Sequence, residues 1–166
     1  MSASDRHLIV DGYNMIHRIG SLERIFRESP EAACESLVKM CRTIHDEDGI
    51  RTTVVFDGRE KQTQIQYPCG RNSFAVVYAP RQLTADGVIE RMLTRAKKPD
   101  RITVASRDNM IREATAARGA FCLDGDGLED WVARCERRIR GRMGSPDKRV
   151  WKQSLEDVWS RVEKKD

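Results

Sequence analysis

The sequence predicts an α/β fold in which a central, mostly parallel sheet is covered by helices on both faces. Short apolar runs of strand length alternate along the chain with stretches whose apolar residues recur at helical spacing. The runs are rich in Val and Ile and apolar throughout, which is typical of strands buried on both faces. With 166 residues, 39% of them hydrophobic, the chain is long enough for one compact domain and a short extension.

Strands are predicted where the apolar runs stop at turn-forming residues. The first run, HLIV at residues 7–10, is followed directly by Asp11 and Gly12. The others are TTVVF at 52–56, FAVVY at 74–78, RITVA at 101–105 and AFCL at 120–123.

Four helices are predicted between or after these strands, at 30–46, 84–97, 109–118 and from 126 to about 140. Ser29 and Pro30 suit the start of the first helix, and Thr84 is a candidate cap for the second. Asp126 and Glu129 form a variant of the capping box for the fourth. This alternation of strands and helices is what favours a parallel sheet.

The C-terminal segment differs in character from the rest of the chain. We predict one domain over residues 1–140 and a basic helical tail over 141–166, in which residues 150–162 form an amphipathic helix. From residue 133 onwards the chain has eleven Lys or Arg and six Asp or Glu, so the positive surplus lies there. Its basic face either contacts RNA or ribosomal RNA, or its charges only keep the helix soluble.

Cysteine usage and hydropathy narrow the class of protein. The five cysteines are odd in number and include no CxxC pair, which argues against a zinc knuckle or a disulfide framework and favours reduced, buried thiols. The N-terminus lacks the apolar stretch of a signal peptide, and no run approaches the length of a membrane span. We expect a soluble, cytoplasmic protein without membrane contact.

Acidic side chains are predicted to gather at one edge of the sheet. Asp11, Asp57 and Asp108 follow three different strands at their carboxyl ends. Asp86 lies in the first turn of the 84–97 helix, and Glu90 lies four residues later on the same face. Ligands of open parallel sheets bind at this edge. Carboxylates crowded together favour a bound Mg²⁺ or Mn²⁺ over zinc, and such an ion can promote phosphodiester hydrolysis.

Each acid also has an ordinary structural explanation. Asp11 and Asp57 precede glycines and can be turn residues. Asp86 can be an acid in the first turn of a helix, where the helix dipole favours negative charge. Asp108 can be a helix N-cap, and Glu90 can pair with a neighbouring arginine. Their coincidence at one rim is what favours a shared function.

Five motifs together resemble a known family. VDGYNMI (10–16), VVFDG (54–58), VVYA (76–79), TADGVIE (84–90) and ITVASRD (102–108) resemble the NYN domains of the PIN-like nuclease superfamily, above all its YacP-like branch. The resemblance covers about residues 7–135 and leaves the chain after Arg140 outside. Gly87 departs from it, because a more polar helix former is usual there.

The resemblance implies a three-layer PIN-like fold and a metal-dependent endoribonuclease of the ribosome-associated kind that cuts mRNA, with Mg²⁺ or Mn²⁺ as cofactor. It implies Asp11, Asp86 and Asp108 as the metal-binding acids, with Asp57 and Glu90 as further candidates. It also implies that Asn14 contacts the metal-bound water or the scissile phosphate.

RNA must be held by groups around this acidic rim. Tyr13, Arg59, Arg81 and Arg107 are the first candidates, since arginines bind phosphates and tyrosine rings stack on bases. Further candidates are Lys61, Tyr67, Arg71, Arg91, Arg95, Lys97 and Lys98. The long loop at 58–72 is expected to contact substrate or ribosome.

Two other classes of function compete with the endoribonuclease. The first is a PIN-like module that binds RNA or the ribosome with little or no catalysis. Such a module can lose a metal-binding acid without harm, and here Asp11, Asp86 and Asp108 are all present. A phosphatase with an aspartyl nucleophile usually has a second Asp two residues after the first, and this chain has Tyr13 there.

Overall fold

The computed structural model describes residues 4–143, and these residues contain a six-stranded sheet. The strands are β1 (Ser4–Asp11), β2 (Ile50–Asp57), β3 (Gln64–Gln66), β4 (Phe74–Ala79), β5 (Ile102–Ala105) and β6 (Phe121–Leu123). Their order is β3-β4-β2-β1-β5-β6, and every pairing is parallel except that of β3 with β4. The predicted mostly parallel sheet is therefore confirmed.

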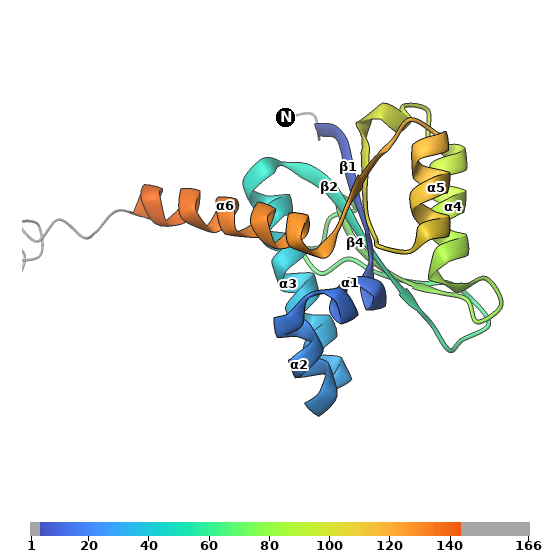
Figure 1. Ribbon diagram of the computed structural model, residues 1–166, viewed down its shortest axis with the longest axis horizontal. Helices are drawn as coiled ribbons and strands as arrows, with labels where there is room; N and C mark the ends of the chain where they lie inside the picture. Colours follow the sequence, from blue (N-terminus) through green and yellow to red (C-terminus); the bar gives the residue numbers. More distant parts are fainter. Residues whose placement is uncertain (1–3, 144–166) are drawn as a thin grey trace, which may run out of the picture. The chain divides into compact units, whose positions relative to one another are not determined.

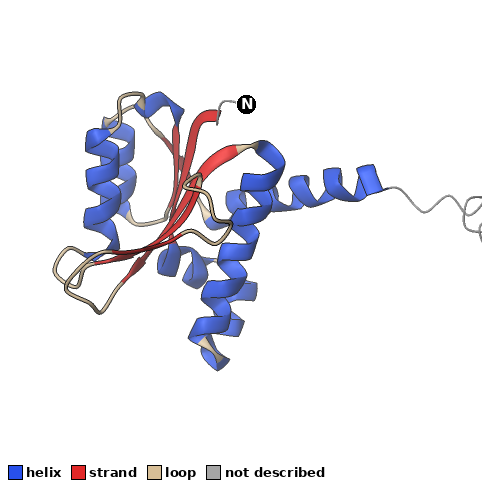
Figure 2. Ribbon diagram, turned by 180° about the vertical axis from the view of Figure 1, so that it is seen from behind, coloured by secondary structure: helices blue, strands red, loops and turns tan. Residues whose placement is uncertain are grey.

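Helices cover both faces of the sheet, as Figures 1 and 2 show. They are α1 (Gly12–Arg18), α2 (Gly20–Glu28), α3 (Pro30–Asp48), α4 (Thr84–Arg95), α5 (Asn109–Ala117) and α6 (Gly125–Met143), with a 3-10 turn at Pro99–Arg101. Helices α4 and α5 lie side by side on one face, and α1 to α3 lie on the other. The three-layer α/β prediction is confirmed.

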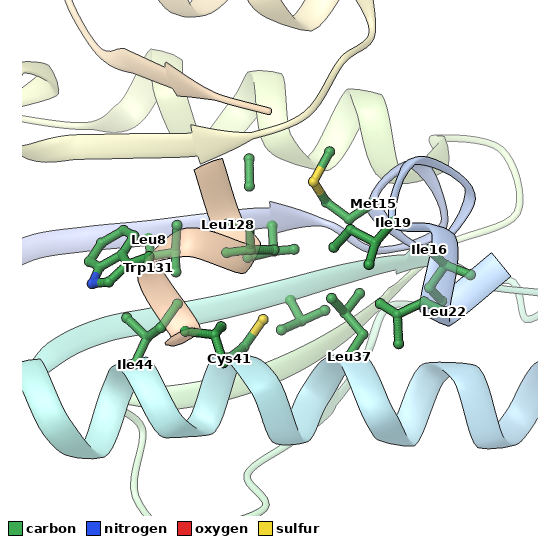
Figure 3. Close-up of a cluster of buried hydrophobic side chains, with 14 of the residues drawn as sticks. Leu8, Met15, Ile16, Ile19, Leu22, Leu37, Cys41, Ile44, Leu128 and Trp131 are labelled. Atoms are coloured by element: carbon green, nitrogen blue, oxygen red, sulfur yellow. The ribbon is translucent and has the colours of Figure 1, made fainter. Parts of the chain in front are cut away.

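The alternation of side chains along the strands builds two apolar cores. Leu8, Val10 and Phe56 point to the α1–α3 face, where Leu37 and Ile44 of α3 pack against them. Figure 3 shows how side chains from β1, α1, α2, α3 and α6 meet in this larger core. On the opposite face, Ile9, Val55 and Val77 pack against Ile89 and Leu93 of α4. Burial on both faces explains why the strands read as continuous apolar runs.

Two helices and one strand were not predicted from the sequence. Helices α1 and α2 have seven and nine residues and no side-chain N-cap, so they lack the usual start signals. Burial of Met15, Ile16 and Leu22 stabilises them instead. Strand β3 lies inside the predicted 58–72 loop, all three of its residues are exposed, and pairing with β4 defines it.

Two predicted helix caps are wrong. Thr84 is the first residue of α4, has a φ of 65° and makes no capping bond. The fourth helix begins at Gly125, and the carboxylate of Asp124 accepts the Gly127 N–H at 2.8 Å, so Asp124 does what was predicted for Asp126. By contrast, Ser29 caps α3 by accepting the Ala32 N–H at 3.2 Å, as predicted.

The chain divides into two compact units, residues 1–135 and 136–166. The first contains the whole sheet and both cores. The proposed boundary at 140/141 stays a prediction, and the predicted helix at 150–162 lies outside the described residues. None of the helices within residues 4–143 combines the length and apolar character needed to cross a membrane.

None of the five cysteines, all of which lie within the described residues, forms a disulfide. They are not uniformly buried, however. Cys41 and Cys135 are buried, Cys34 and Cys69 are half-buried, and Cys122 is exposed.

Candidate active site

The sheet delivers acidic residues to its carboxyl edge from neighbouring strands. Strand β1 ends at Asp11 and strand β2 ends at Asp57, and the two strands are parallel neighbours. Strand β5 lies on the other side of β1 and leads within three residues to Asp108. Asp86 lies in the first turn of α4.

The electrostatics show that these acids form one cluster. Burial raises the pKa of Asp11 to about 6; a hydrogen bond from Ser106 opposes this, and repulsion from Asp86, Asp57 and Asp108 adds to it. The pKa of Asp86 is also raised, first by burial and then by repulsion from Asp108, Asp57 and Glu90. We call Asp11, Asp57, Asp86, Glu90 and Asp108 the acidic cluster.

Asp11 is held rigidly at the centre of this edge. Its side chain is buried, with 5% of its surface exposed. The Ser106 hydroxyl donates to Asp11 Oδ2 at 2.9 Å, and the Asp108 N–H donates to the Ser106 oxygen at 3.1 Å. Ser106 thus connects Asp11 to the backbone that carries Asp108. Sequence reasoning did not single it out, although it is the serine of the SRD motif.

Asp108 and Asp57 also cap helices. Asp108 Oδ1 accepts the Ile111 N–H at 3.1 Å and is the N-cap of α5, as its ordinary explanation required. Asp57 Oδ1 accepts the Ala85 N–H at 2.7 Å, so a strand-end carboxylate caps α4 directly before Asp86. Anionic caps at helix N-termini are stabilised by the helix dipole, which helps to hold negative charge at this rim.

Asn14 links two segments of the site. Its side-chain oxygen accepts the Arg107 N–H at 2.8 Å, and this bond ties α1 to the loop between Ser106 and Asp108. The side chain of Asn14 is thus bonded to the loop that leads to Asp108.

The donor chemistry of the acidic cluster fits a hard divalent cation, because every available ligand is a carboxylate oxygen. Within residues 4–143, no three His, Cys, Asp or Glu side chains are already arranged so as to hold a metal ion. Asp86 and Glu90 are exposed, so their side chains have room to turn. The acids are thus close enough to repel one another without being closed around a cation.

A shallow cavity of about 90 Å³ extends from the cluster between α4 and α5. Asp86 and Glu90 lie on its polar side, and Ile89, Leu93 and Met110 are among its apolar lining residues. Glu90 therefore reaches the site beside Asp86, on the same face of α4, as its spacing predicted.

The residues predicted to bind RNA lie in different environments. Tyr13 is half-buried and packs edge-on against Phe26 and Phe56, with ring centroids 6.3 and 5.2 Å away, so its ring contributes to the core. Arg59, Arg81 and Arg107 are exposed. Lys98 is engaged in an ion pair with Asp5 at 2.8 Å. The other candidates are exposed, namely Lys61, Tyr67, Arg71, Arg91, Arg95 and Lys97.

Comparison with known structures gives the same fold. The chain is similar to Rae1 (YacP) from Bacillus subtilis, with 29% identity and a TM-score of 0.68 over 95% of this chain and 92% of that chain. A mutant of that protein, in which one tryptophan is replaced by leucine, gives 27% identity and a TM-score of 0.66 over 95% and 89% of the two chains. No curated protein matches the chain.

The family comparison covers almost the whole sequence. The model of the YacP-like NYN domain matches residues 8–166, a range that includes the C-terminal segment left outside the resemblance by the sequence motifs. The three-layer fold, with its central sheet between two layers of helices, is the PIN-like fold of the YacP structures. This protein belongs to the family of YacP-like NYN domains.

Proposed function

We propose that the protein is an endoribonuclease that depends on Mg²⁺ or Mn²⁺ and hydrolyses phosphodiester bonds in RNA. The observation that carries the proposal is the buried Asp11 carboxylate, which Asp57, Asp86 and Asp108 approach closely enough to repel at the carboxyl edge of the sheet. Such a group is costly to the fold, and a bound cation offsets that cost. Membership of the YacP-like NYN family, whose fold is that of a nuclease, supports the same chemistry.

The residues have distinct parts in this mechanism. Asp11, Asp86 and Asp108 would hold the cation, with Asp57 and Glu90 beside them. When bound, a divalent ion supplies an activated water and neutralises charge on the phosphate. Ser106 orients Asp11, and Asn14 holds the 106–108 loop so that Asp108 keeps its place. Exposed Arg81 and Arg107 would bind the phosphates on either side, and exposed Arg59 would also contact the RNA strand.

We further propose mRNA in a ribosome-associated context as the substrate, since this is what the YacP-like motifs imply. The competing function is a module that binds RNA or the ribosome without cutting. Both bind the same partner, so only a cleavage assay separates them.

The test uses purified protein and end-labelled single-stranded RNA, with and without ribosomes, in Mg²⁺, Mn²⁺ or EDTA. Asp86→Asn should lower cleavage by more than about 100-fold, the upper end of the loss for groups that merely orient a metal ligand. Asp100→Asn is the matched control, because Asp100 is exposed in the 3-10 turn before β5 and outside the acidic cluster. Binding of RNA without cleavage by the unaltered protein in any metal would contradict catalysis and support the binding module.

A further inference from the structure

A second cavity lies beyond Asp57 at the β3 side of the sheet. It has a volume of about 140 Å³, and we call it the edge cavity. Arg59, Glu60 and Gln62 line it from the loop after β2, Gln64 lines it from β3, and Tyr78 from the end of β4. None of these residues belongs to the acidic cluster.

The walls of the edge cavity are held by main-chain hydrogen bonds. The Gly58 N–H donates to the Ala79 oxygen at 3.0 Å, and the Arg81 N–H donates to the Glu60 oxygen at 2.8 Å. A Cβ atom at Gly58 would lie 2.3 Å from the Ala79 oxygen, so only glycine permits this approach. The loop after β2 is therefore fixed against the end of β4, and the cavity is formed before any ligand binds.

The edge cavity adjoins the proposed site of chemistry. Its wall begins at Gly58, the residue after Asp57. The Asp57 carboxylate in turn accepts the Ala85 N–H at 2.7 Å, directly before Asp86. The edge cavity and the acidic cluster thus meet at Asp57.

The lining matches the chemistry of a nucleobase. Tyr78 is half-buried against the larger core, stacked on Phe56 with centroids 5.8 Å apart and an interplanar angle of 25°, and it also lines the cavity. Gln64 lies directly opposite Tyr78 in the β3–β4 register. Glutamine amides and an arginine read the edges of unpaired bases, and aromatic rings stack on their faces. Glu60 in the same lining disfavours a bare phosphate, because two negative groups would repel each other.

We propose that the edge cavity binds one unpaired nucleobase of the RNA strand near the scissile phosphate and gives the enzyme its base preference. This inference rests on the proposed function, and it adds a recognition site outside the acidic cluster.

The first experiment measures cleavage of single-stranded RNA whose bases are varied at each position around the cut. Gln64→Ala and Arg59→Gln should weaken discrimination at one position by about fivefold or more, as expected for losing a base-edge contact. Gln66→Ala is the matched control, because Gln66 shares β3 with Gln64 yet does not line the cavity. All three side chains are exposed, so the variants should melt like the parent.

The second experiment is independent of catalysis. An oligonucleotide carrying 4-thiouridine is bound in EDTA, irradiated, and the crosslinked peptide is identified by mass spectrometry. A crosslink within residues 58–64 or to Tyr78, all part of the cavity or its loop, that Gln64→Ala weakens and Gln66→Ala retains would support the proposal.

The outcomes separate the two proposals. Cleavage with equal rates for all bases, or with a preference that Gln64→Ala and Arg59→Gln leave unchanged, would overturn the edge cavity while the nuclease stands. Absence of cleavage in every metal would overturn the proposed nuclease activity. The position of the crosslink would then decide by itself whether the edge cavity binds a nucleobase. Crosslinks confined to segments other than residues 58–64 and 78–79 would overturn the edge cavity.

Discussion

At the scale of single residues, the Asp11 carboxylate at the centre of the site destabilises the folded state. Asp11 is buried among like charges, and only the Ser106 hydroxyl opposes the rise in its pKa to about 6. Groups with strongly shifted pKa values concentrate at functional sites, because function requires environments that stability alone would not select. Substitution of Asp11 should therefore have opposite effects on the stability of the fold and on its activity.

We predict that Asp11→Asn stabilises the metal-free protein and abolishes cleavage. The folded pKa of Asp11, about 6, exceeds its ordinary 3.8, so the folded state binds more protons between these values and loses stability as the pH rises through them. Above pH 6 the carboxylate costs on the order of 2–3 kcal/mol, and asparagine removes that cost while its oxygen still accepts from Ser106. Melting in EDTA should show a higher Tm for the variant at pH 8 and little difference at pH 4. A variant that is less stable at pH 8 would contradict the argument.

Asn14→Ala should cut cleavage strongly and change Tm little. It removes one exposed hydrogen bond, worth about 1 kcal/mol, but frees the loop that carries Asp108. Asn14→Asp keeps an oxygen for the Arg107 N–H and serves as a partner variant: activity retained there would assign Asn14 a purely positioning role. A large drop in Tm with unchanged specific activity in Asn14→Ala would show a turn-stabilising residue instead.

At the scale of elements, the start of α4 depends on another part of the chain. The helix has no side-chain cap of its own, and Thr84 enters it with a φ of 65°, an uncommon conformation for a β-branched residue. The Asp57 carboxylate supplies the missing cap from the end of β2. The position of Asp86 is thus set jointly by a strained residue and a distant acid, and strain of this kind is concentrated at functional sites.

Asp57→Ala should therefore destabilise the fold by about 1 kcal/mol, the usual cost of losing an N-cap. It should also lower cleavage, because the first turn of α4 carries Asp86. Asp57→Asn retains a capping oxygen and should keep most of the stability, which thermal melting of the three proteins would show. If alanine and asparagine variants melt together with the parent, the cap is unimportant.

At the scale of the whole molecule, the fold should lose stability in mild acid through His7. Burial lowers the pKa of His7 to about 4, with a further effect of Arg51, and its ring bonds to the Thr53 hydroxyl at 2.8 Å. The unfolded chain takes up a proton near pH 6.5, whereas the folded protein does not do so until about pH 4. The contribution of His7 to the free energy of unfolding is thus constant above pH 6.5, and the free energy of unfolding falls as the pH drops from 6.5 to 4. The loss is at most about 3 kcal/mol, because partial exposure of His7 screens its charge.

His7→Gln should flatten this dependence. Denaturant unfolding at pH values from 4 to 7, read as the difference between variant and parent, cancels contributions from other groups such as Asp11. An unchanged difference across the range would show that His7 takes up its proton in the folded protein as readily as in the unfolded chain.

Much of the architecture follows from the sequence itself. Apolar runs and helical spacing are local signals, and they predicted β1, β2, β4, β5, β6 and the helices α3 to α6. The carboxyl-edge positions of Asp11, Asp57 and Asp108 follow from the same signals, since parallel strands all end at one rim.

The tertiary structure decided what local signals do not contain. The bond from Ser106 to Asp11 joins residues 95 apart, and that from Ala85 to Asp57 joins residues 28 apart. Helices α1 and α2 exist because Met15, Ile16 and Leu22 are buried, and β3 exists because β4 lies beside it. The sequence by itself determined most of the elements and which acids reach the rim. Packing decided how those acids are held and where the edge cavity lies, because capping, burial and strand pairing there depend on contacts between distant parts of the chain.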